Sequence, residues 1–221
     1  MTKSNMEKSP PKGSVRFSLS LSPEQKRAKT EILKHPFNFI VGKAGSGKTL
    51  LAVQVALDQF FKREFNKIII TRPTISTEDN GFLPGSEREK MEPWLVPIRS
   101  NMRKIYNKPN ILQKMESNEQ IELVSLAHFR GRTFDNSIVI VDEFQNLTRS
   151  QLAMAVGRLG KDSKMLFCGV SYQIDLKDKN YSAYHDMAKL VNSEYVYKTV
   201  LEDSHRHDAI DNLLELLNGY H

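Results

Sequence analysis

Short, unbroken runs of apolar residues recur along the chain of 221 residues. Such runs indicate strands that are buried on both faces, as in a parallel sheet covered by helices. They predict strands at residues 37–41, 68–71, 121–124, 137–141 and 164–168, with a further candidate at 196–201.

Apolar residues with helical spacing lie between some of these runs, most clearly at 50–63 and 149–159. An earlier helix is predicted to begin at residues 22–25, because Ser22 is a good N-cap and is followed by a proline and an acidic residue. Pro36 opposes its continuation past residue 35. The alternation of strands and helices predicts a three-layer α/β domain.

Proline and glycine mark the parts of the chain that lack this pattern. Residues 1–20 are polar, contain adjacent prolines and show no period, so we expect a flexible tail before one domain at residues 21–221. Glycines at 81–85, with Pro93 and Pro97, predict a long excursion between the second and third strands.

Composition narrows the class of protein. Hydrophobic residues make up 39% of the chain, which is enough to form a core. The single cysteine, Cys168, excludes an internal disulfide and favours a reducing compartment. The first residues lack the apolar stretch of a secretory signal, and no run of about 18 apolar residues could span a membrane. We therefore expect a cytoplasmic protein without a membrane partner.

The formal net charge is +6 at pH 7. A basic surface attracts polyanions such as nucleic acid, but a solvated surface with a lysine-rich N-terminal segment would give the same charge. The charge therefore supports nucleic-acid binding only together with other signals.

A phosphate-binding loop is the strongest motif in the chain. The stretch GKAGSGKT satisfies G-x-x-x-x-G-K-[ST], with an apolar strand before it and an amphipathic helix after it. Lys48 is predicted to contact the β- and γ-phosphates of ATP, and the Thr49 hydroxyl to bind Mg²⁺. Backbone amides and the positive end of the helix would cradle the phosphates. The cradle consists of Gly42, Lys43, Ala44, Gly45, Ser46 and Gly47.

Two acids follow the apolar run at 137–141. Ligands of open α/β sheets bind at the carboxyl ends of the strands, so this pair is expected beside the phosphate loop. Asp142 is predicted to hold Mg²⁺ through water, and Glu143 to orient and polarise the attacking water. An acidic turn is common after a strand, and only the phosphate loop makes a catalytic role the better interpretation.

Kinases of small metabolites also carry a phosphate loop and transfer the phosphoryl group to a substrate hydroxyl. The Asp142–Glu143 pair favours hydrolysis, since one acid is left for water, but it does not exclude transfer.

The motifs, taken in order, resemble the PhoH family of P-loop ATPases. The matching stretches run from about residue 21 to the C-terminus. They are GKAGSGKT at Gly42–Thr49, TRP at Thr71–Pro73, GFLPG at Gly81–Gly85, RGRTF at Arg130–Phe134, VDEFQN at Val141–Asn146, QIDL at Gln173–Leu176 and RH at Arg206–His207.

The resemblance implies a RecA-like three-layer core with a mainly parallel sheet, similar to the first motor domain of superfamily 1 helicases. It also implies a homo-oligomer, such as a hexameric ring, and Mg²⁺-dependent ATP hydrolysis coupled to RNA or single-stranded DNA. One hypothesis is a nucleic-acid motor or remodeller. A second is an assembly switch whose slow turnover from ATP to ADP resets a conformation, and a small-molecule kinase is the third.

The resemblance also implies roles for residues outside the two main motifs. Gln25 is similar to a glutamine that reads adenine, although an ordinary surface glutamine is an equal alternative. Gln173 is similar to a sensor of the γ-phosphate. Arg206 is similar to an arginine that stabilises charge on that phosphate, from its own or a neighbouring subunit. A salt bridge to Glu202 or Asp203 is its alternative.

Nucleic-acid contacts are the least specific of these expectations. Arg72 resembles a nucleic-acid-contacting position, and Arg130 and Arg132 place two cations across one glycine. All three arginines fit structural ion pairs equally well. The chain departs from the family pattern at Val170, where an acid is usual, and at Phe144, where a small residue is usual.

Overall fold

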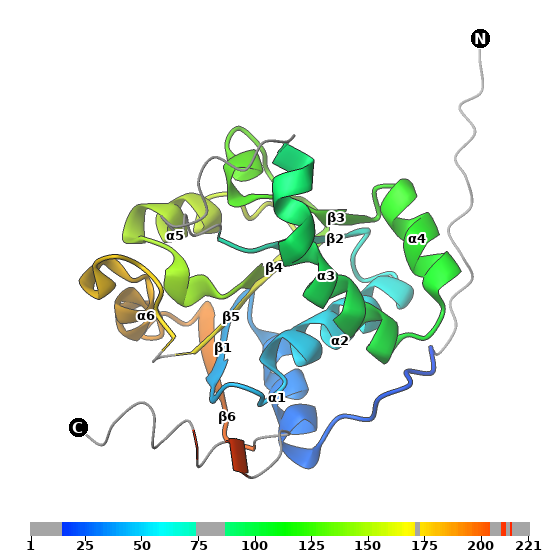
Figure 1. Cartoon of the computed structure of the whole chain (residues 1–221), viewed down its shortest axis with the longest axis horizontal. Helices are drawn as coiled ribbons and strands as arrows, with labels where there is room; N and C mark the ends of the chain where they lie inside the picture. Colours follow the sequence, from blue (N-terminus) through cyan, green and yellow to red (C-terminus); the bar gives the residue numbers. More distant parts are fainter. Residues whose placement is uncertain (1–14, 74–86, 171–172, 204–208, 211–212, 214–221) are drawn as a thin grey trace.

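The computed structural model describes residues 15–73, 87–170, 173–203, 209–210 and 213, and Figure 1 shows their arrangement. All six predicted strands are confirmed, and they form one sheet in which every pair is parallel, in the order β3-β2-β4-β5-β1-β6. The strands are β1 (Phe37–Gly42), β2 (Lys67–Thr71), β3 (Ile121–Leu123), β4 (Ser137–Asp142), β5 (Lys164–Gly169) and β6 (Val196–Leu201).

Helices cover both faces of this sheet, as Figure 1 shows. One face packs against α1 (Pro23–Lys34), α2 (Lys48–Phe61), α3 (Glu87–Ile105) and α4 (Pro109–Ser117). The other packs against α5 (Arg149–Val156), α6 (Tyr184–Leu190) and the 3₁₀ turn η2 (Leu126–Phe129). Along β4, Ile138 and Ile140 face the first set, whereas Val139 and Val141 face the second. Both faces of the central strands are therefore buried, and the predicted RecA-like three-layer α/β architecture is confirmed.

The first helix begins and ends where the sequence predicts. The Ser22 hydroxyl accepts a hydrogen bond from the Gln25 backbone amide, and the Gln25 side chain accepts one from the Ser22 amide, each at 3.2 Å. This reciprocal pair is a capping box, which satisfies two amides that the helix leaves without partners. The chain becomes extended at His35, before Pro36.

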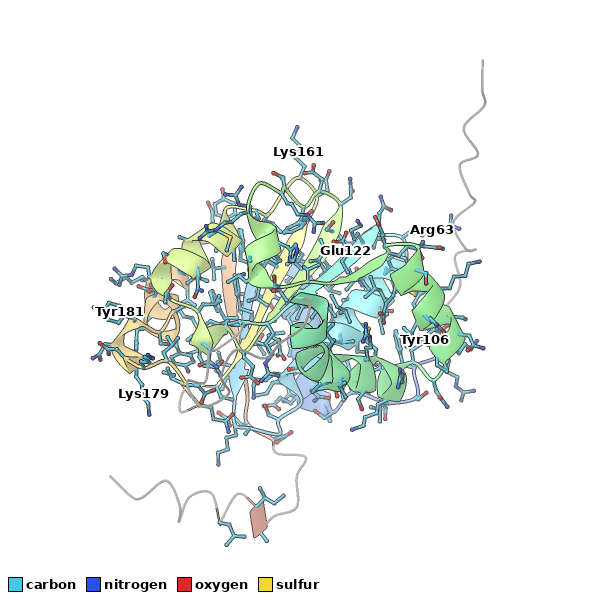
Figure 2. The ribbon with its side chains drawn as sticks, turned by 45° about the horizontal axis from the view of Figure 1, so that its top comes forward. Arg63, Tyr106, Glu122, Lys161, Lys179 and Tyr181 are labelled. Carbon is cyan, nitrogen blue, oxygen red and sulfur yellow. The ribbon has the colours of Figure 1, made fainter. Side chains whose placement is uncertain are left out.

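The segment between β2 and β3 contains more regular structure than expected. The long excursion predicted here contains two helices that the sequence analysis did not specify, since Pro97 lies within the 19-residue helix α3, and α4 follows. Ile98, Met102 and Ile105 recur on one face of α3 and are buried against the first core. At its end, Tyr106, labelled in Figure 2, packs against Phe61 with ring centroids 5.1 Å apart. The predicted motif at 81–85 lies outside the described residues.

Part of the segment expected as a tail is packed onto the domain. Val15 and Phe17 are partly buried against the first core. The Ser18 amide donates to the Ile105 carbonyl at 2.8 Å, and the Gln54 side chain donates to the Leu19 carbonyl at 3.2 Å. Residues 15–20 therefore form hydrogen bonds with both α2 and the end of α3. Within the described ranges, no helix is both long and apolar enough to cross a bilayer.

Candidate nucleotide-binding site

The phosphate loop joins β1 to α2 through glycines with left-handed backbone angles. Gly42 has φ +148°, and a Cβ atom there would lie 2.1 Å from the Leu201 carbonyl oxygen of β6. Gly45 and Gly47 have φ values of 86° and 80°. Only glycine adopts these conformations without strain, and Gly47 leaves the N-terminus of α2 without a side-chain cap. The loop is therefore shaped to bring backbone amides and the helix end to an anion.

Lys48 lies in the first turn of α2, and its ammonium folds back onto the loop. The Nζ atom donates to the carbonyls of Gly42 and Lys43 at 3.1 and 2.6 Å, and to the Ser46 hydroxyl at 3.3 Å. The residue is only 9% exposed. A positive charge is thus held inside the predicted phosphate cradle.

Thr49 and Asp142 meet across 93 residues of sequence. The Thr49 hydroxyl donates to Asp142 Oδ1 at 2.7 Å. Burial, and next the charge of Glu143, raise the pKa of the Asp142 carboxyl to about 6, against opposing effects of Thr49 and Arg72. A hydroxyl and a buried carboxylate are hard oxygen ligands of the kind that Mg²⁺ prefers, and a cation would offset the cost of burying this charge. The two residues fit a magnesium site.

Glu143 follows directly in an unusual backbone conformation. Its φ and ψ are 53° and 42°, in the left-handed region that non-glycine residues rarely adopt. One carboxylate oxygen lies 3.7 Å from Arg72 Nη2, and the other accepts a 2.6 Å hydrogen bond from Gln145 Nε2. The turn directs the acid away from the strand and toward these two partners.

These groups share one cavity of about 840 Å³, a size typical of small-molecule sites. Its lining includes the loop residues Lys48 and Thr49, together with Arg72, Glu143 and Gln173. The remaining walls come from residues 19–22 with Gln25, and from α3. The predicted loop, metal and water residues are therefore brought together at the carboxyl edge of the sheet.

Comparison with known proteins shows the family of the chain. The family model described as "PhoH-like protein" matches residues 19–218. The chain belongs to the PhoH-like family. A PhoH-like protein of Synechocystis is 42% identical over 66% of this chain and 44% of its own length. Those of Mycobacterium leprae and Bacillus subtilis are 33% and 36% identical, over 89% and 80% of this chain and 57% and 56% of theirs. The chain spans about half the length of these relatives.

Solved structures share the fold at low identity. The Pif1 helicase of Candida albicans aligns with a TM-score of 0.51 and 17% identity, over 90% of this chain and 43% of that one. The large terminase of a thermophilic bacteriophage aligns with a TM-score of 0.53 and 8% identity, over 89% and 50%. These likenesses place the PhoH-like chain among P-loop folds of the helicase and terminase type.

Gln25 of this PhoH-like chain is not an ordinary surface glutamine, since it is only 4% exposed. Its Nε2 donates to the Ser46 carbonyl at 3.3 Å, while its Oε1 accepts from the Ser22 amide. The side chain therefore ties the start of α1 to the phosphate loop, at the wall of the cavity. Its reading of adenine stays a prediction.

The four predicted arginines differ in position. Arg72 lies in the cavity beside Glu143, whereas Arg130 and Arg132 do not line it. Arg132 donates at 2.8 Å to Glu122, labelled in Figure 2, and its guanidinium lies 4.9 Å from the Phe134 ring centroid. Arg130 is exposed. Arg206 lies outside the described residues.

Several residues at the site were given no role from the sequence, among them Asn101, Lys104 and Gln145. Asn101 and Lys104 reach the cavity from α3, one turn apart. Their spacing could have been noticed only if that helix had been expected. Gln145, the third, lies in the VDEFQN motif and contacts Glu143. Phe144, the departure beside it, is fully buried and packs against Phe39 with centroids 5.1 Å apart.

Proposed function

We propose that this PhoH-like chain binds ATP with Mg²⁺ and hydrolyses it, and that hydrolysis is coupled to RNA or single-stranded DNA in a homo-oligomer. The observation that best supports this is the 2.7 Å contact between the Thr49 hydroxyl and Asp142. It joins the phosphate loop to the acidic strand end inside a cavity that also contains Glu143.

The triphosphate would bind in the loop. Lys48 now donates to backbone carbonyls, and it would exchange these partners for β- and γ-phosphate oxygens without leaving the cradle. The N-terminus of α2 adds a partial positive charge at the same place. Thr49 and Asp142 are the residues that would hold Mg²⁺, which would supply positive charge to offset that of the phosphates.

The nucleoside would occupy the rest of the cavity. Residues 19–22 form one wall there, and Pro97, Asn101 and Lys104 of α3 form the other. Leu21 and Leu50 supply apolar surface for a base or ribose, and the nearby amides supply polar contacts. Gln25 also lines the cavity, and its side chain donates a hydrogen bond to the Ser46 carbonyl of the loop.

Hydrolysis would use the acid that does not hold the metal. Glu143 accepts a hydrogen bond from a water molecule and takes its proton as the water oxygen bonds to the γ-phosphorus. The bond from that phosphorus to the bridging oxygen breaks, and ADP and phosphate leave. Arg72, 3.7 Å from Glu143, adds positive charge near the γ-phosphate end.

Coupling to nucleic acid rests on the charge of +6, the exposed Arg130 and the family resemblance. Steady-state ATP hydrolysis, with and without single-stranded RNA and DNA, tests it, with Lys48→Ala as the blank. Stimulation several-fold above basal turnover supports coupling, and the better polymer identifies the substrate. Lys48-dependent hydrolysis that is indifferent to both polymers would favour an assembly switch. Phosphate appearing on an added metabolite would favour a kinase.

A further inference from the structure

The amide side chain of Gln145 lies completely buried between the two parts of the site that act on the γ-phosphate end. Its Nε2 donates to Glu143 Oε2 at 2.6 Å and to the Gln173 carbonyl at 3.0 Å. Its Oε1 accepts a hydrogen bond from the Val170 amide at 3.3 Å. Both N–H groups of the amide are thus used, one on the predicted water-activating acid and one on the predicted sensor segment.

The glycine at the end of β5 leaves room for the Gln145 side chain. A Cβ atom at Gly169 would lie 2.5 Å from Gln145 Oε1 and 2.6 Å from a ring carbon of Phe144. The end of β5 therefore requires glycine if the amide is to reach Val170. The next residue, Asn146, exchanges hydrogen bonds with Asp175, at 3.2 Å through its Nδ2 and 2.8 Å through its Oδ1. Two successive amides thus connect the acidic turn to the chain that follows β5.

Glu143 needs such support because few other groups fix its carboxylate. The residue has a left-handed backbone, and its side chain is partly exposed, with the Arg72 guanidinium 3.7 Å from one carboxylate oxygen. A glutamate side chain that is free to change rotamer would be in the productive orientation for only part of the time.

We propose that Gln145 is a positioning residue for ATP hydrolysis, which orients the Glu143 carboxylate and fastens it to the chain at Val170 and Gln173. This inference rests on the proposed function. Gln145 does not touch the reacting atoms, and it acts through Glu143. A shift of Gln173 on engaging the γ-phosphate would be transmitted to the acid through the shared amide.

Two substitutions of Gln145 distinguish its effect on the orientation of the Glu143 carboxylate from the effect of its own packing. Gln145→Glu keeps the size and the acceptor atom but removes both donors and places a second carboxylate beside Glu143. Loss of a hydrogen bond to a charged group predicts a fall in kcat of about tenfold or more, with the KM for ATP changed by less than about threefold. Gln145→Ala is expected to lower kcat at least as much. Gly169→Ala, which displaces the amide, should give the same phenotype.

A second readout does not depend on turnover. Hydrogen–deuterium exchange of the nucleotide-free protein should show faster exchange of the Val170 amide in Gln145→Ala than in wild type. Gln59→Ala is the matched control, because Gln59 is also a buried amide, bonded to Asp58 of α2 and absent from the cavity wall. It should leave kcat and Val170 exchange unchanged.

The outcomes distinguish this inference from the function on which it rests. Wild-type kcat in Gln145→Glu, or unchanged Val170 exchange in Gln145→Ala, would overturn the positioning role while leaving ATP hydrolysis intact. The positioning role would also be overturned if the fall in kcat were fully explained by a smaller number of ATP-binding sites, counted by titration. Wild-type protein without any Lys48-dependent hydrolysis would overturn both.

Discussion

At the scale of single residues, the buried carboxylate of Asp142 lowers the stability of the folded protein. The side chain is almost fully buried, and its pKa is raised to about 6 from a usual value of 3.8. Ionisation is therefore less favourable in the folded state than in the unfolded chain, by about 3 kcal/mol at neutral pH. Such a cost is typical of a residue kept for binding or catalysis.

Asp142→Asn is expected to stabilise the protein at pH 7.5 in the absence of metal and nucleotide, by about 1–3 kcal/mol. The amide oxygen can still accept from Thr49, and the buried charge is gone. Because the folded-state pKa is raised, the wild type loses stability as pH rises from about 4 to about 6. The gain should therefore vanish below about pH 4. Urea denaturation in EDTA across this range is the measurement, and an equal or less stable variant at pH 7.5 would contradict the interpretation.

Motif spacing was enough to predict that the phosphate loop and the acid pair meet in the cavity. Lys48 and Thr49 follow from the loop signature, and Asp142 and Glu143 follow because parallel strands end at one edge. The contact between Glu143 and Gln145 was not predictable, since it depends on the left-handed backbone conformation of Glu143. The cavity wall from α3 was missed for the same kind of reason, because it depends on tertiary packing.

At the scale of elements, β6 approaches the phosphate loop too closely for any side chain at Gly42. Gly42→Ala is expected to lower the free energy of unfolding by at least about 2 kcal/mol, since it combines overpacking against the Leu201 carbonyl with an unfavourable backbone angle. Gly131→Ala is the matched control. Gly131 has φ +74° but no atom within 4 Å of the added Cβ, so only the conformational cost of about 1 kcal/mol applies. Equal losses in the two variants, by urea denaturation, would argue against the close approach.

The wall formed by α3 predicts a contact with the nucleoside rather than the phosphates. Asn101→Ala should weaken ATP binding by about three- to tenfold, the loss of roughly one hydrogen bond. Binding of inorganic tripolyphosphate should not change. Isothermal titration with both ligands makes the comparison. An equal loss for the two ligands would place Asn101 at the phosphates, and no loss for either would remove it from the site.

Prediction of elements succeeded where local signals agree with the fold. The strands were predicted because they are short apolar runs, of which the central ones are buried on both faces, and α1 was predicted because its cap and its terminating proline are local. Helix α3 was missed because Pro93 and Pro97 lie inside it. Proline opposes a helix locally, and only the burial of the apolar face against the sheet outweighs that preference.

At the scale of the whole molecule, the proposed homo-oligomer predicts that a neighbouring subunit can complete the surroundings of the γ-phosphate. If Arg206 acts across a subunit boundary, then Arg206→Ala and Glu143→Gln should each be inactive alone and should complement when mixed. In a random equimolar ring, about a quarter of the interfaces would combine an intact Glu143 with an intact Arg206. Turnover that stays at the sum of the two variants would mean that Arg206 acts within its own chain or not at all.

The function of the site can be tested most directly by separating ATP binding from ATP cleavage. The measurement is Mg²⁺-dependent turnover together with equilibrium ATP affinity, for wild type, Lys48→Ala and Glu143→Gln. We expect Lys48→Ala to lose binding, and Glu143→Gln to bind ATP within about threefold of wild type while its kcat falls by about 10²–10⁴. Wild-type turnover in Glu143→Gln would contradict the assignment of Glu143 as the residue that activates water.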